Sequence, residues 1–221
     1  MIDLDLIIES VPQLLQGLKN SLLIACISSI IGLIGGTIIA MIEKSSESTD
    51  YMQYVIFVYV NVIRGTPMLI QILFAYYVLP QWGIYISPFA TACVVIGINS
   101  TAYISQVIRS GIDAIAQGQW DAARSLGFTE WQIFRFIILP QAIGNVLPSL
   151  VNEVITLIKD SSLASVIGVA ELTKEGRIII GRTYDSITVF FALALFYICV
   201  TWTITYGIYR LERRTRRHVS N

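Results

Sequence analysis

An uncharged stretch from Gly65 to Ile108 is the feature that most constrains this chain. As one straight helix it would extend about 66 Å at about 1.5 Å per residue. Because the apolar layer of a membrane is only about 30 Å thick, the stretch must fold back on itself. Only 14% of the residues are charged, whereas soluble domains carry roughly 25%. The sequence therefore predicts an integral membrane protein, with the break at Leu79-Pro80-Gln81-Trp82-Gly83.

Apolar segments of suitable length predict an all-α protein with about five transmembrane helices. The expected spans are Ser21–Ile42, Gly65–Val78, Pro88 to about Ile108, Phe136–Ile158 and Ser186–Tyr209. The second span can also begin near Tyr51, which would make Gly65-Thr66-Pro67 a kink. Pro140 and Pro148 predict a kinked fourth span, and Ser87-Pro88 is typical of a helix start.

Charge is distributed unevenly between the two ends of the chain. The acidic residues Asp3, Asp5 and Glu9 precede the first span, whereas five arginines follow the last one: Arg210, Arg213, Arg214, Arg216 and Arg217. By the positive-inside rule we expect the N-terminus outside and the C-terminus in the cytoplasm. The expected organisation is an extracytoplasmic segment over 1–17, a single transmembrane domain over 18–209 and a basic cytoplasmic tail over 210–221. The N-terminus lacks the features of a cleavable signal.

Several classes of function are disfavoured by composition. The net charge is zero, which gives no electrostatic reason to expect a nucleic-acid partner. Cys26, Cys93 and Cys199 lie far apart in apolar stretches, so we expect neither a disulfide framework nor a metal cluster, and interpret them as buried small apolar residues. His218 is the only histidine, which disfavours His-dependent hydrolysis and His-ligated metals.

The segment from about 110 to 135 is expected to be cytoplasmic and contains a compact turn. Asp121 to Leu126 can form a short helix, and Gly127 is well placed to end it in a left-handed conformation. Thr129-Glu130-Trp131-Gln132 matches a capping box for a second helix. Ala122 and Ala123 would give this elbow a smooth face for another protein. The alternative is a plain connecting loop, since short helix–turn–helix links are common.

Polar side chains interrupt two of the apolar spans. Glu153, Thr156 and Asp160 would share one face of a helix, and Asn99, Tyr103 and Gln106 would share a face of another. An ionised acid inside a membrane costs about 2.5–3.5 kcal/mol on insertion scales, so Glu153 should face a partner or a wet cavity. The alternatives are that Glu153 pairs with Lys159 or a neighbouring subunit, that Asp160 lies at the water boundary, and that the amides join helices. Gly32 and Gly36 predict close helix packing.

Several motifs occur together in a fixed order. They are Gly118-Gln119-Trp120-Asp121-Ala122-Ala123-Arg124-Ser125-Leu126-Gly127, Ile138-Leu139-Pro140-Gln141-Ala142, Arg64-Gly65-Thr66-Pro67 with Gln71, Asn99 with Ala102-Tyr103, and Asn152-Glu153 with Lys159-Asp160-Ser161-Ser162-Leu163. The combination resembles the permease subunits of polar amino acid ABC importers over most of the chain. The chain departs from that family at Asp121 and Gln106, where Glu is usual.

The resemblance implies a type I ABC importer permease in a bacterial cytoplasmic (inner) membrane. It implies that the elbow docks into a cytoplasmic ATPase dimer through Gln119, Asp121, Ala122, Ala123, Ser125, Leu126 and Gly127. The chain has no G-x-x-x-x-G-K-[ST] loop, so we expect ATP and magnesium on the partner and no enzymatic activity or cofactor here. Further expected partners are a second permease copy or paralogue, an extracytoplasmic amino acid-binding protein and membrane lipid.

A free amino acid carries an ammonium and a carboxylate that both need partners when it leaves water. We expect Glu153 to receive the ammonium. Asn99 and the groups around Ser161 would receive the carboxylate, especially if a helix begins there, with Asp160 and Gln106 also in contact. Transport would proceed by alternating access. A stand-alone channel or gradient-driven carrier is the alternative, although no internal repeat is evident; a non-transporting membrane subunit is a third reading.

Overall fold

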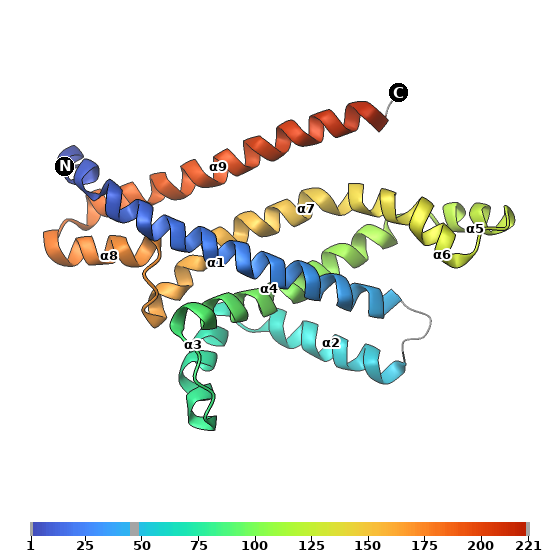
Figure 1. The fold of residues 1–221 in the computed structure, drawn as a ribbon, viewed down its shortest axis with the longest axis horizontal. Helices are drawn as coiled ribbons and strands as arrows, with labels where there is room; N and C mark the ends of the chain where they lie inside the picture. Colours follow the sequence, from blue (N-terminus) through green and yellow to red (C-terminus); the bar gives the residue numbers. More distant parts are fainter. Residues whose placement is uncertain (1, 45–48, 220–221) are drawn as a thin grey trace. The chain divides into compact units, whose positions relative to one another are not determined.

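A computed structural model of the chain describes residues 2–44 and 49–219, and the regular elements in these ranges are helices (Figure 1). The α-helices are α1 (Leu4–Lys44), α2 (Asp50–Gly65), α3 (Met68–Val78), α4 (Pro88–Asp113), α5 (Gln117–Ser125), α6 (Glu130–Ile133), α7 (Leu139–Asp160), α8 (Leu172–Thr183) and α9 (Ser186–Val219). Two 3₁₀ segments, Leu79–Trp82 and Ser161–Ile167, and a π-helical segment, Phe134–Ile138, complete the described helices.

The number of apolar helices agrees with the expected spans. Four stretches are long and apolar enough to cross a membrane, namely Leu4–Lys44, Pro88–Asp113, Glu130–Ile167 and Ser186–Gly207. A fifth is counted when the bent pair Asp50–Gly65 and Met68–Trp82 is taken as one broken span. The break between the two helices falls at the Gly65-Thr66-Pro67 step, where proline removes a backbone donor and where the sequence predicted an interruption.

Most helix ends lie where local signals placed them. The Ser87 hydroxyl accepts a hydrogen bond from the Ala90 amide (3.3 Å) and α4 begins at Pro88, as expected. The break after α3 is a 3₁₀ turn that ends at Gly83, which has a φ of +80°. The Thr49 hydroxyl caps α2 by accepting from the Met52 amide.

Three expectations need correction. Helix α1 begins at Leu4 rather than Ser21, because the polar side chains of its first half alternate with apolar ones that pack inward, such as Leu14. The segment between the last two spans contains a further helix, α8, which the sequence analysis did not anticipate. Of the cysteines, only Cys93 is buried, whereas Cys26 and Cys199 are exposed on apolar helices of the single chain. All three thiols are free.

The chain divides into two compact units, which are described separately. Unit 1 comprises the described parts of Met1–Ser29, Met68–Ile96 and Val154–Asn221, and unit 2 comprises those of Ile30–Pro67 and Gly97–Glu153. Unit 1 is held by an apolar cluster that includes Ile24, Ile72, Ile96, Leu157 and Ile167. A second cluster joins α8 to the first halves of α1 and α9. The tail side chains after Arg210 lie outside what the structure describes, and the single domain over 18–209 stays a prediction.

Unit 2 is organised around close contact between α1 and α4. A Cβ atom added to Gly32 would lie 2.5 Å from Ser100 Oγ, and one added to Gly36 would lie 2.6 Å from Ile104 Cγ2. The predicted Gly32–Gly36 packing seam is therefore confirmed, because only glycine leaves room for the facing helix. On the other side of α4, Tyr59 of α2 donates a hydrogen bond to the Ile98 carbonyl at 2.7 Å.

Substituting Gly36 by valine should separate α1 from α4. The new side chain meets Ile104 at less than van der Waals distance, and overpacking of this kind costs about 1–3 kcal/mol. Gly144→Val is the matched control, because no atom lies within 4 Å of a Cβ added at that helical position. We expect Gly36→Val to lower the melting temperature in detergent well below that of Gly144→Val; equal melting temperatures would contradict the seam.

Candidate coupling site and intramembrane polar groups

The expected elbow is present between α4 and α7 and belongs to unit 2 (Figure 1). Helix α5 ends at Ser125, and Gly127 follows with a φ of +80°. The Phe128 amide donates to the Ala123 carbonyl at 3.2 Å and the Gly127 amide to the Arg124 carbonyl at 3.0 Å. These bonds satisfy the last carbonyls of α5 in the manner of a glycine-terminated helix. The expected helix starts earlier than predicted, at Gln117 rather than Asp121.

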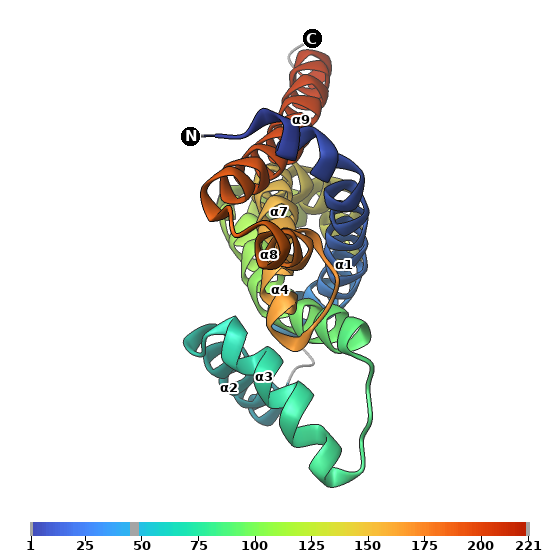
Figure 2. The same cartoon turned by 90° about the vertical axis from the view of Figure 1, so that its left-hand side faces the viewer.

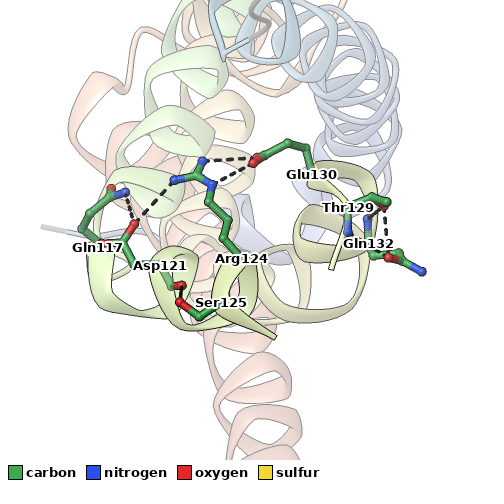
Figure 3. Close-up of polar contacts among 7 residues, drawn as sticks. All are labelled: Gln117, Asp121, Arg124, Ser125, Thr129, Glu130 and Gln132. Carbon is green, nitrogen blue, oxygen red and sulfur yellow. Dashed lines mark hydrogen bonds and ion pairs between the residues drawn. The ribbon is translucent and has the colours of Figure 1, made fainter. Parts of the chain in front are cut away.

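The second half of the elbow is fixed by the predicted capping box. The Thr129 hydroxyl accepts a hydrogen bond from the Gln132 amide at 3.3 Å, and Gln132 Oε1 accepts one from the Thr129 amide at 2.9 Å (Figure 3). The two residues thus satisfy each other's free amides at the start of α6. Helix α6 continues through the π-helical segment into α7, and this segment was not anticipated.

Arg124 joins the two helices across the turn, and sequence reasoning assigned it no role. Its guanidinium donates to both carboxylate oxygens of Glu130, at 2.7 and 3.3 Å, and lies 3.5 Å from Asp121 Oδ1 (Figure 3). Gln117 also donates to Asp121 at 3.3 Å. All these groups are exposed, so each pair adds little stability, but the two-pronged geometry favours one angle between α5 and α6.

Two large apolar side chains are exposed on the elbow. Leu126 is 77% exposed and Trp131 is 67% exposed, although both lie among charged side chains. Gln119, Ala122 and Ser125 are also exposed. Exposed large apolar side chains are typical of surfaces that take part in protein–protein contacts.

The expectation that Ala123 faces outward is wrong. Ala123 is buried against Ile115, Ile133, Ile138 and Ala142. The reason is geometric: α5 folds back on the start of α7, so the face that carries Ala123 closes the small apolar core of the elbow. The small side chain of Ala123 determines how closely α5 packs against this core, whereas Ala122 remains exposed.

Unit 2 brings together several of the predicted polar groups. Glu153 of α7 accepts a hydrogen bond from Ser100 Oγ at 3.0 Å, and the neighbouring Asn99 is buried. One turn along α4, the Tyr103 ring lies beneath the guanidinium of Arg64, 5.2 Å from its centroid. Gln106 is half-buried on the same helix. Two side chains three residues apart on α4 therefore contact groups of opposite charge: Ser100 contacts Glu153, and Tyr103 contacts Arg64.

The remaining predicted residues lie in unit 1. Asp160 is half-buried at the end of α7, and Ser161 is fully buried, with its hydroxyl donating to the Ile158 carbonyl at 2.7 Å. The chain passes from α7 into the 3₁₀ segment with right-handed helical geometry at Asp160, so no separate α-helix begins at Ser161. A 3₁₀ helix does begin at Ser161, directly after α7, and the Ser161 hydroxyl is engaged by the backbone, so carboxylate binding at this position stays a prediction.

Glu171 is a buried acid that sequence reasoning missed. Its side chain caps α8 by accepting from the Thr173 and Lys174 amides at 3.0 and 2.8 Å. Ser21 of α1 and Tyr197 of α9 donate to the same carboxylate at 3.3 and 3.4 Å. Glu171 therefore joins three helices of unit 1, α1, α8 and α9, which are labelled in Figure 2. Burial raises the pKa of Glu171 above its ordinary value, although these hydrogen bonds act in the opposite direction.

In the described part of the chain, no group of three or more His, Cys, Asp or Glu side chains is arranged to hold a metal ion. The candidate sites are the elbow and a set of polar groups on the apolar helices.

Residues 32–217 match the family described as "Binding-protein-dependent transport system inner membrane component". The glutamine transport system permease protein GlnP of Escherichia coli (strain K12) is 38% identical over 211 residues, which are 94% of each chain. The arginine transport system permease protein ArtQ of Bacillus subtilis (strain 168) is 35% identical over 216 residues, 97% of this chain and 98% of that protein.

A solved structure titled as an amino acid ABC transporter with histidines has a TM-score of 0.91 and 38% identity, covering 97% of this chain and 99% of that one. The fold is therefore that of an ABC importer permease, as the motifs predicted. The chain belongs to the family of binding-protein-dependent inner-membrane transport components, in its polar amino acid ABC permease branch.

Replacing Glu171 should change the dependence of stability on pH. Because its pKa is higher in the folded protein, the stability it adds is complete below its ordinary pKa of about 4.3 and is lost as pH rises through the raised value. Glu171→Gln should remove that loss, which melting curves of the purified protein across this range would show. Glu171→Ala should also remove the pH dependence and should cost about 0.5–2 kcal/mol relative to Glu171→Gln, because the amides at the start of α8 lose their cap. An unchanged pH profile in Glu171→Gln would contradict this account.

Proposed function

We propose that the chain forms half of the translocation pathway of an ATP-driven importer for a polar amino acid, and works by alternating access. The elbow carries this proposal: Gly127, the capping box and Arg124 hold two short helices so that Leu126 and Trp131 project from them. A permease without a nucleotide-binding loop needs an energy-supplying partner, and an exposed apolar tip on a rigid base is suited to insertion into a cleft of an ATPase.

The ATPase would contact Gln119, Ala122, Ser125, Leu126 and the Gly127 turn, with Asp121 at the edge of the contact. Ala123 acts differently, since it packs inside the elbow and sets its shape. ATP and magnesium would bind the partner dimer, and the permease itself would make and break no covalent bond. When the ATPases close, the elbow would move with the surface into which it is inserted.

The substrate class follows from the intramembrane charges of unit 2. Glu153 offers a carboxylate for an ammonium group, and Arg64 offers a guanidinium for a carboxylate. Asn99 lies beside Ser100, where its amide can bind either group. An amino acid that leaves water needs both charges satisfied, and charge-assisted hydrogen bonds are the strongest available. Asp160, Ser161 and Gln106 stay secondary candidates, with Ser161 weakened by its bond to the backbone.

The remaining assignments complete the transporter. The permease would lie in a bacterial inner membrane with its N-terminus outside and its basic tail in the cytoplasm. A second copy or a paralogue would form the other half of the pathway, and an extracytoplasmic binding protein would deliver the amino acid. A stand-alone carrier is the competing function. Purification in mild detergent distinguishes the two, because an importer subunit retains an ATPase in stoichiometric amounts and a carrier does not.

Gly127→Val should uncouple ATP hydrolysis from uptake. Left-handed backbone costs a residue other than glycine about 1–2 kcal/mol, most of all when it is β-branched, so the elbow would lose its shape. Uptake in proteoliposomes should fall by about 5- to 30-fold. Gly127→Asn is the matched control, because asparagine tolerates this conformation and should retain most of the uptake. Equal uptake by the two variants would show that the turn geometry is irrelevant.

Glu153→Gln should weaken substrate binding and leave assembly intact. The amide still accepts the Ser100 hydrogen bond, but it lacks the charge that an ammonium requires. Hydrogen bonds to charged groups exceed neutral ones by about 1–1.5 kcal/mol, which predicts about a tenfold rise in the KM for uptake. Co-purification with the ATPase should not change. A normal KM in a fully assembled variant would show that Glu153 does not contact the ammonium.

A further inference from the structure

Four charged side chains meet where α1 and α4 end, within unit 2. Arg109 of α4 lies 3.2 Å from Glu43 of α1, and Lys44 of α1 contacts Asp113 of α4. Arg109 also lies 3.7 Å from Asp113, one helical turn along α4. Each helix thus contributes one acid and one base, and the four charges sum to zero. The set of Glu43, Lys44, Arg109 and Asp113 is called the charge clasp below.

Burial of Glu43 distinguishes the charge clasp from an ordinary surface ion pair, although Lys44, Arg109 and Asp113 are 37–49% exposed. The Glu43 side chain is 12% exposed, and its Oε2 has no hydrogen-bond donor among the described residues. Its charge is therefore compensated chiefly through the Arg109 contact to Oε1. Exposed ion pairs add little to stability, but a buried carboxylate is destabilising unless a basic partner compensates its charge. A network of four charges also fixes the positions of its side chains more firmly than a single pair does.

The charge clasp lies at the base of the elbow. Asp113 is the last residue of α4, and α5 begins at Gln117, so only a short turn separates the clasp from the helix that would enter the ATPase. In the other direction, α1 and α4 stay in contact along the glycine seam, from Gly36 to Gly32. There Ser100 touches the seam and donates to Glu153. Continuous contacts of α1 and α4 therefore lead from the elbow to Glu153.

We propose that the charge clasp is a permanent link that fixes the elbow to the α1–α4 pair, so that movement of the elbow reaches the helices that hold Glu153. This inference rests on the proposed coupling to an ATPase and names the residues that transmit it. Glu43 and Arg109 would act as positioning residues, because Arg109 contacts Glu43 and Asp113, and neither residue is among those proposed to bind the ATPase or the substrate. A gate would be built from the same charges, but its pairs would have to separate in every transport cycle.

Charge reversal tests the link in the complete transporter, reconstituted with its ATPase and binding protein. Glu43→Arg and Arg109→Glu should each lower the number of amino acids imported per ATP hydrolysed by about fivefold or more, the lower end of typical coupling between sites. The double variant restores opposite charges and should recover the ratio to within about twofold, as expected for a direct interaction. Glu9→Arg, an exposed reversal at the other end of α1, is the control and should leave the ratio unchanged.

Cross-linking distinguishes a link from a gate and does not depend on how the reversed variants fold. Lys44→Cys and Asp113→Cys would be combined in a chain whose Cys26, Cys93 and Cys199 are replaced by alanine. A short thiol cross-linker should then restore the import-to-hydrolysis ratio that the loss of the ion pair lowers. Loss of import on cross-linking would overturn the proposal, because it would show that the ends of α1 and α4 must part.

The two proposals fail in different ways. If the wild-type chain retains no ATPase, the coupling function itself is wrong. If the wild-type transporter imports normally and the single reversals leave the ratio unchanged, or the double variant fails to recover it while still assembled, only the charge clasp is wrong.

Discussion

The membrane interior offers no hydrogen-bond partners, and this constraint determines most of the structure. A chain that carries no charge from Gly65 to Ile108 can satisfy its backbone only within helices, which is why the described elements are helical. Apolar packing alone gains little between helices in lipid, so their association depends on close approach and on the few polar contacts. The polar side chains discussed above therefore lie where helices contact each other or at a candidate site: the α1–α4 seam, the Glu153 contact, the Glu171 cap and the elbow.

Three of these places, the α1–α4 seam, the Glu153 contact and the elbow, belong to unit 2 and are connected within it. The same two helices carry the charge clasp near one end and the glycine seam along their length, and Ser100 extends the contact to α7. The elbow is closed by its own core around Ala123 and is stiffened by Arg124 and the capping box. The proposed coupling to an ATPase requires a rigid elbow on a rigid helix pair, because a flexible connection would absorb the movement before it reached Glu153.

Local signals in the sequence predicted the parts of the fold that depend on local chemistry. The Gly127 stop, the Thr129–Gln132 box, the Ser87-Pro88 start and the kink at Thr66-Pro67 all depend on residues within a few positions of each other. The order of the motifs along the chain also predicted the family, because the resemblance rests on their combination and not on any single motif.

What depends on contacts between distant residues was not predictable from patterns. Glu171 lies between an apolar stretch and a charged one and gives no local sign of its contacts; only the fold brings Ser21 and Tyr197 to it. The burial of Ala123 follows from α5 folding back on α7, which spacing within α5 does not reveal. The partners of Glu43 and Lys44 lie far along the chain, on α4. Arg64 was noted as part of a motif, but its position over Tyr103 depends on how α2 packs against α4.

The most direct measurement places a photoactivatable amino acid at Leu126 in living cells and identifies what it captures. The account predicts a covalent adduct between this position and a nucleotide-hydrolysing subunit, formed from the cytoplasmic side and lost when the elbow is distorted. Capture of lipid alone would contradict it, as would labelling of a Leu126→Cys variant by a membrane-impermeant thiol reagent added from outside.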